Sequence, residues 1–339
     1  MEKVVVVSDL HLGEEGCSLR DEAIVSSFIE ELKAQGEIDQ FILLGDILDL
    51  SMGGFSKATE DAKPFFEAIL GVDIKEILYL PGNHDHHLWV LEAEHRDIIQ
   101  KIRNGGIPES PNYIREFKGK ETFISGIFPD SMKDKLIVKY PNHIAKVKEK
   151  RYFFHHGHYL STEGTLICNI DEALKKCDSL NDFELENSPI HELIQYSLEQ
   201  APHMKEKIKE AWKGGGEQLA MFTVIDEMLD SFKKWQYFFS PLIRFFLIIN
   251  LIKPKPIRGT KIDNKMIERI ENYIKLSEET CDCFVFGHTH IPEGKIKNSL
   301  IIANAGSWLN EGDGASNSYI VIDDKVTIKK LGIKESIWM

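Results

Sequence analysis

The sequence has no excess of positive charge. Its 54 acidic residues outnumber the 41 lysines and arginines, and the formal net charge is −13. Proteins that bind nucleic acid non-specifically neutralise phosphates with clustered Lys and Arg, so we expect no nucleic-acid partner. The charge does not exclude a hydrolase of phosphorylated substrates, because bound divalent cations add positive charge that a residue count omits.

Paired cysteines are also missing. The five cysteines contain no CxxC pair and do not form the framework of a small secreted domain, so we interpret them as reduced packing residues. They are Cys17, Cys168, Cys177, Cys281 and Cys283. A strand-like run begins at Val4, which leaves no room for a signal peptide, and we expect a cytoplasmic protein.

No apolar stretch is long enough to form a membrane-spanning helix, which needs about 20 residues. The most apolar one, Phe238–Ile252, is shorter and contains Pro241, Arg244 and Asn250. Its basic and aromatic flanks are typical of a segment that lies on a membrane surface or lines an acyl-chain pocket. The core of a helical region or a subunit contact explains the same composition. Peripheral membrane contact and an oligomer therefore both stay open.

Short apolar runs alternate with helical patterns in the first third of the chain. Strands are expected at residues 4–7, 41–44 and 77–80, with helices at residues 21–35 and 60–70 between them. This order implies parallel strands covered by helices. Ligands bind at the carboxyl ends of the strands in such sheets.

The middle of the chain changes character. Later strands are expected at residues 113–117, 123–128, 152–155, 283–286, 300–303, 319–322 and 326–330. Helices are expected at residues 166–177, 189–200, 203–213, 217–235 and 265–279. We therefore predict an α/β core formed by residues 1–160 and 281–339. Residues 161–280 would form a helical insertion that closes over this core.

Five of the expected strands are followed by residues that can bind a metal. The groups are Asp9 and His11; Asp46 and Asp49; Asn83, His84 and Asp85; His155, His156 and His158; His288 and His290. Any one group alone is typical of an ordinary turn, but five in succession behind strands are not explained by turns. Imidazoles with carboxylates suit Mn, Fe, Co or Zn, whereas Mg or Ca alone would call for oxygen ligands throughout. Two such ions about 3.5–4 Å apart can clamp a phosphate for in-line attack.

With these motifs the sequence resembles the calcineurin-like metallophosphoesterase superfamily over residues 4–158 and 283–308. The resemblance implies a four-layer α/β/β/α sandwich and hydrolysis of a phosphomonoester, phosphodiester or pyrophosphate by a metal-bridging hydroxide. The substrate would be small or lipid-like. Two divalent transition-metal ions are implied, with Mn favoured and Fe, Zn, Co or Ni as alternatives. One would be held by Asp9, His11, Asp46 and His290, and the other by Asp46, Asn83, His156 and His288.

The resemblance also implies roles for the remaining motif residues. His84 would contact the phosphate and protonate the leaving oxygen, oriented by Asp49, and Asn83 would also face the substrate. The family pattern makes His156 the ligand, while His155 should point to the opposite face of its strand. His158 would contact phosphate or support a ligand from behind.

Two rival functions follow from the same residues. The opening residues 8–13 are similar to the UDP-2,3-diacylglucosamine hydrolase branch, which has a helical insertion that holds acyl chains. The sequence departs from that branch at His84, where the branch has Arg. One rival is therefore a membrane-surface pyrophosphohydrolase of a nucleotide-linked lipid precursor. The other is a non-catalytic metal-binding scaffold, although such proteins usually lack ligands that are all present here.

Overall fold

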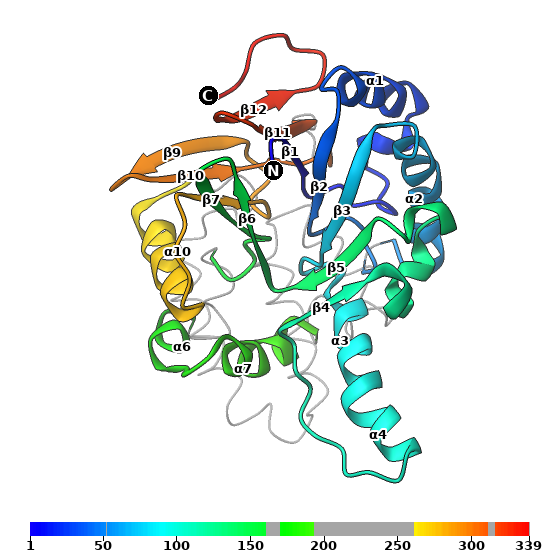
Figure 1. Cartoon of the computed structure of the whole chain (residues 1–339), viewed down its shortest axis with the longest axis vertical. Helices are drawn as coiled ribbons and strands as arrows, with labels where there is room; N and C mark the ends of the chain where they lie inside the picture. The colour runs from blue at the N-terminus through cyan, green and yellow to red at the C-terminus, as the bar shows by residue number, and fades with distance from the viewer. Residues whose placement is uncertain (52, 161–169, 193–260, 311–315, 339) are drawn as a thin grey trace, which may run out of the picture.

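Two β-sheets stacked face to face lie at the centre of the protein (Figure 1). The structure is a computed structural model that describes residues 1–51, 53–160, 170–192, 261–310 and 316–338. The seven-stranded sheet has the order β12 (Val326–Lys330), β11 (Ser318–Ile322), β1 (Val4–Val7), β2 (Ile38–Leu44), β3 (Ile74–Leu80), β5 (Leu136–Tyr140) and β4 (Arg115–Lys118). The five-stranded sheet has the order β6 (Asn142–Val147), β7 (Lys150–His155), β8 (Cys283–Phe286), β10 (Leu300–Asn304) and β9 (Glu293–Lys297).

Side chains alternate between the two faces of each sheet and so build separate cores. In β1, Val4 and Val6 pack between the sheets, whereas Val5 and Val7 pack outward beneath α1 (Glu22–Lys33) and α2 (Phe55–Ile69). The outer face of the five-stranded sheet packs against α6 (Ile170–Lys176) and α10 (Asn264–Leu276). Helices therefore cover both outer faces, and the expected α/β/β/α sandwich is confirmed.

The strands that lead to the predicted motifs run parallel. β1, β2, β3 and β5 pair in parallel in one sheet, and β7, β8 and β10 do so in the other. Their carboxyl ends, with the loops that follow them, therefore meet at one edge of the sandwich.

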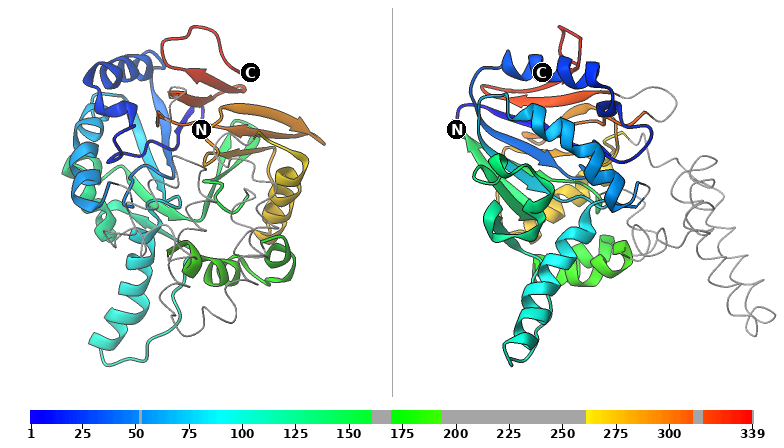
Figure 2. Two further views of the ribbon diagram at one scale, coloured as in Figure 1. Left: turned by 180° about the vertical axis from the view of Figure 1, so that it is seen from behind. Right: turned by 90° about the vertical axis from the view of Figure 1, so that its right-hand side faces the viewer.

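A helical arm projects from this body and was not expected from the sequence. It consists of α3 (His86–Glu94), the π-helical η2 (His95–Ile99) and α4 (Gln100–Arg103) (Figures 1 and 2). The start of the arm has buried apolar residues on several sides of the helix: Leu88, Trp89, Val90 and Ala93. It therefore lacks the single apolar face by which an amphipathic helix is recognised in a sequence. Short 3₁₀ turns complete the described elements: η1 (Ser18–Arg20), η3 (Gly119–Glu121), η4 (Phe123–Ile127) and η5 (Asp130–Met132).

One expected strand is wrong, and one expected helix begins earlier than predicted. Within the strand expected at residues 123–128, residues 123–127 form the 3₁₀ turn η4, because the Thr122 side chain caps Ile124 N–H and turns the chain. The helix expected at residues 189–200 begins nine residues before Pro189, at Leu180 of α7 (Leu180–Glu192). Residues 189–192 are helical as expected, and residues 193–200 lie outside the described residues. Proline favours the first turn of a helix, which is why the pattern suggested a start at Pro189.

The predicted insertion is described only in part, at residues 170–192 and 261–280. Phe238–Ile252 and the helices expected at residues 203–213 and 217–235 lie outside the described residues, and the predicted domain boundaries stay predictions. Within the described ranges, no helix is long and apolar enough to cross a membrane. Cys17, Cys177, Cys281 and Cys283 are free thiols, as expected.

Candidate metal centre

The loops after β1 and β2 run side by side beyond the ends of their strands. Asp9 N–H donates to Gly45 O at 3.0 Å, and His11 N–H donates to Asp46 O at 2.9 Å. The loop after β8 joins them, because His288 N–H donates to Asp9 Oδ2 at 2.9 Å. This backbone network brings motifs from both ends of the sequence into one site.

Two glycines allow this close approach. A Cβ on Gly82 would lie 2.4 Å from Asp46 Oδ1, and one on Gly287 would lie 1.9 Å from Ser8 Oγ and 2.4 Å from Asp9 Oδ2. Any larger residue at either position would therefore displace a carboxylate of the site.

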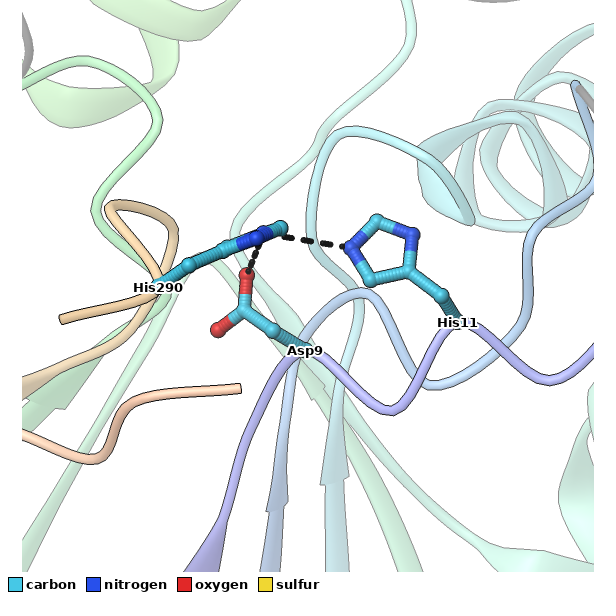
Figure 3. Close-up of side chains that lie close together, drawn as sticks. All are labelled: Asp9, His11 and His290. Carbon is cyan, nitrogen blue, oxygen red and sulfur yellow. Dashed lines mark hydrogen bonds and ion pairs between the residues drawn. The ribbon is translucent and has the colours of Figure 1, made fainter. Parts of the chain in front are cut away.

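Asp9, His11 and His290 form the first of three groups of side chains that could hold a cation (Figure 3). His290 Nε2 lies 3.2 Å from Asp9 Oδ1 and 3.3 Å from His11 Nε2. Asp9 and His11 are fully buried. Three donor atoms from the loops after β1 and β8 thus point at one another.

Asp46, His156 and His288 form the second group, and Asn83 joins it. His156 Nε2 lies 3.1 Å from both Asp46 Oδ2 and Asn83 Oδ1, while His288 Nδ1 lies 3.0 Å from the same Asn83 oxygen. Asp46 Oδ2 is also 3.9 Å from His11 Nε2 in the first group. Asp46 therefore stands between the two groups, where a shared ligand would have to be.

The hydrogen bonds of two imidazoles orient their Nε2 atoms into the site. His156 Nδ1 donates to Leu44 O at 2.9 Å, so the ring turns Nε2 toward the oxygens of Asp46 and Asn83, which carry no proton. His11 Nδ1 donates to Asp49 Oδ2 at 3.0 Å and likewise presents Nε2 to His290. Nitrogen and oxygen atoms this close together need a positive charge among them, either a proton on an imidazole or a bound cation. This set of ligand atoms fits a divalent transition metal.

Protons on histidine balance carboxylate charge in the site. Burial opposes ionisation of Asp46, yet His156 and His84 hold the pKa of this carboxyl well below its ordinary value. In turn, against the effect of burial, the Asp46 carboxylate raises the pKa of His156 to about 9. Burial, together with His156, lowers the pKa of His288 well below its ordinary value. A proton therefore occupies His156, and a divalent cation would have to displace it.

Five of the predicted ligands have a left-handed backbone. Their φ angles lie between 49° and 64°, a region that residues other than glycine seldom adopt. They are Asp9, His11, Asp46, His288 and His290. Backbone strain of this kind concentrates at functional sites, where surrounding hydrogen bonds hold it in place.

A third group lies beside the first and consists of His11, Asp49 and His84. Asp49 Oδ2 is 3.3 Å from His84 Nδ1, and the rings of His84 and His11 have centroids 4.8 Å apart. Despite burial, His84 and His11 hold the pKa of the Asp49 carboxyl well below its ordinary value. An ionised carboxylate thus orients His84 next to the candidate metal centre.

The His155–His158 segment divides as the pattern predicted for its first two residues. His156 faces the metal centre, whereas His155 packs against Tyr273 in the outer core, with ring centroids 4.5 Å apart. His158 lies behind His156, with Nε2 3.4 Å from Tyr140 Oη, and its contact with substrate stays a prediction.

Sequence reasoning missed four side chains that support the site. Asp85 accepts from Ile47 N and Gly82 N and so ties two ligand loops together, while Ser51 lies beside Asp49 and His84. On α7, Glu192 bonds His86 and His87, and Glu184 accepts from Tyr140 and Tyr159. Asp85 stood inside a motif, but no sequence signal marked the other three.

Comparison with known proteins places the chain in a family. No curated protein sequence matches it. Among solved structures, zinc-bound Vps29 from Entamoeba histolytica has 10% identity and a TM-score of 0.38, covering 98% of this chain and 95% of that one. The Yfce phosphoesterase of E. coli has 12% identity and a TM-score of 0.36, with 99% and 96% covered.

An archaeal phosphodiesterase has 9% identity and a TM-score of 0.37, with 97% of this chain and 99% of that one covered. Likeness at this level leaves activity and substrate open. The family model for calcineurin-like phosphoesterases, in contrast, matches residues 2–223, which include the first four of the five motifs. The chain therefore belongs to the calcineurin-like phosphoesterase family.

Proposed function

We propose that this protein is a metal-dependent phosphoester hydrolase that uses two divalent cations. The observation that carries the proposal is the convergence of imidazole nitrogens and carboxylate oxygens in two groups, with Asp46 between them. One cation would be held by Asp9, His11, Asp46 and His290, and the other by Asp46, Asn83, His156 and His288. The imidazole-rich donor set supports Mn, Fe, Zn, Co or Ni over Mg.

When bound, two such cations activate water as a nucleophile and neutralise the charge of the phosphate. The residues around them supply orientation and a proton. His84 would hold a proton at Nε2 for the leaving oxygen, because its Nδ1 faces Asp49 and Ser51. Asp49 orients the ring and stabilises its protonated form.

The His84 and Asp49 pair favours catalysis over the scaffold function. A protein that only bound metal would have no use for a buried imidazole oriented by a carboxylate beside the metal centre. The choice among monoester, diester and pyrophosphate, and a small or lipid-like substrate, remain proposals from the sequence. So does peripheral membrane contact through Phe238–Ile252, as in a lipid-precursor pyrophosphohydrolase.

The test combines metal analysis with turnover. Mn-loaded protein should contain two metal ions per chain and hydrolyse at least one of an aryl phosphate, an aryl phosphodiester or a pyrophosphate. Asp46→Asn should retain at most one ion and lose about 10²-fold or more in kcat, because several kcal/mol of charge stabilisation are removed.

Asp97→Asn is the matched control, since Asp97 is a buried carboxylate that pairs with Arg115 away from the centre. This variant should keep both ions. Two bound ions without turnover of any of the three substrates would identify a scaffold instead. Full activity in Asp46→Asn would refute the ligand assignment.

A further inference from the structure

Ser51 lies fully buried in the loop after β2, where it contacts the loop that carries His84. Its side chain has no exposed surface. Its Oγ lies 3.0 Å from Asp49 Oδ1 and 3.1 Å from His84 Nδ1. The main chains also approach here, as Leu50 N–H points to His84 O at 3.4 Å.

The Asp49 carboxylate oxygen that faces His84 is shared with a second histidine. This oxygen, Oδ2, serves two imidazoles, at 3.0 Å from His11 Nδ1 and 3.3 Å from His84 Nδ1. The shorter contact belongs to His11. Ser51 Oγ is therefore the nearer acceptor for His84 and binds the other oxygen of the same carboxylate.

The direction of each proton follows from the donor inventory. The Asp49 carboxylate only accepts, so the single hydroxyl proton of Ser51 must be donated to Asp49 Oδ1. The Ser51 oxygen then has only lone pairs left for His84, so His84 Nδ1 must carry a proton and donate it. Because Nδ1 keeps its proton, His84 can give a proton to a substrate only from Nε2 of its imidazolium form, and it is left as the neutral Nδ1–H tautomer.

We infer that Ser51 is a positioning residue that fixes the tautomer and ring orientation of His84 through a closed Ser51–Asp49–His84 triangle. The inference rests on the proposed function, because it gives His84 its direction as a proton donor. The positioning of His84 by Ser51 matters most for substrates with poor leaving groups, which depart only when protonated.

The kinetic test compares two substrates in Mn-loaded protein. Ser51→Ala should lower kcat on an alkyl phosphate by about tenfold, the size expected when one hydrogen bond to a charged group is lost. The loss on an aryl phosphate should be at most about twofold, with KM and metal content unchanged. Ser51→Thr retains the hydroxyl and should restore most of the alkyl phosphate activity.

Ser125→Ala is the matched control, because Ser125 is a buried serine whose Oγ donates to Thr122 O in η4. It should leave the ratio of the two kcat values unchanged. Two outcomes with folded Ser51→Ala would overturn the inference. One is an equal fold loss in kcat on both substrates, and the other is no loss on either.

A second readout does not depend on turnover. Imidazole ¹⁵N NMR of the zinc-loaded protein, assigned by the signals lost in His84→Gln, should show the Nδ1–H tautomer of neutral His84. Ser51→Ala should shift these signals toward a mixture with the Nε2–H tautomer, and Ser51→Thr should not. Wild-type protein that hydrolyses none of an aryl phosphate, an aryl phosphodiester and a pyrophosphate would refute the proposed function, while an Nε2–H tautomer in wild type would refute the role of Ser51.

Discussion

Glu184 offers a quantitative test of the junction between α7 and the core. Its side chain is fully buried, and Oε2 accepts from Tyr140 Oη at 2.9 Å and from Tyr159 Oη at 2.8 Å. Burial raises the pKa of this carboxyl from its ordinary value of 4.5 to about 7, although His86 and the two tyrosine hydroxyls act in the opposite direction. Between pH 4.5 and about pH 7, we therefore expect Glu184 to be protonated in the folded protein and ionised in the unfolded chain.

The sign and the size of the effect follow from linkage. A raised pKa in the folded state stabilises the fold fully below the unfolded value of 4.5, and this contribution is lost as the pH rises through about 7. The difference between the two pKa values corresponds to about 3 kcal/mol in the free energy of unfolding. Glu184→Gln keeps a neutral side chain of the same shape and removes the titration.

Urea unfolding at about pH 4 and about pH 8 measures this contribution. Wild type and Glu184→Gln should have similar stability at the lower pH. At the higher pH the variant should be more stable, by about 3 kcal/mol if the unfolded chain titrates normally. Glu186→Gln controls for the loss of a negative charge on the exposed side of α7. Parallel curves for wild type and Glu184→Gln would refute the reasoning and show that Glu184 is buried as an ion.

Two further predictions concern the geometry of the metal centre. Gly287→Ala should weaken metal affinity in calorimetric titration by about tenfold or more, because its Cβ would displace Asp9, whereas Gly126→Ala has no atom within 4 Å and should bind normally. An unchanged affinity for Gly287→Ala would contradict the packing described. His156→Ala should release one metal ion in elemental analysis, and His155→Phe should retain both, because His155 faces the outer core. Loss of an ion from His155→Phe would show that the two histidines are exchanged.

The strand-end residues of the site could be predicted from the sequence because parallel strands place their carboxyl ends at the same edge of a sheet. β1, β2 and β3 are buried apolar runs, and the chain can leave such strands only at the sheet edge where ligands bind. β9 was missed for the opposite reason. Its sequence, Glu293–Lys297, is mostly polar and partly exposed at the edge of the second sheet, so it has no apolar run to detect.

The supporting residues could not be predicted because their roles depend on contacts between distant segments. Glu192 bonds His86 and His87 across more than a hundred residues, and Glu184 reaches Tyr140 across forty-four. Neither carboxylate differs in sequence from the solvated acids around it on α7. Only the packing of α7 against the start of α3 and the end of β5 distinguishes them.

The left-handed ligands explain why the site needs both sheets. A strained φ at Asp9, His11 or Asp46 costs on the order of 1 kcal/mol or more, and an isolated loop would relax it. Here Asp9 N–H bonds Gly45 O, Asp9 O accepts from Trp308 N–H at 3.0 Å, and the Asp9 carboxylate accepts from His288 N–H. Each of these bonds comes from a loop after a different strand, and those strands belong to two sheets. The strain therefore persists only while the sheets stay packed, so the arrangement of the ligands depends on the core between the sheets as well as on the motifs themselves.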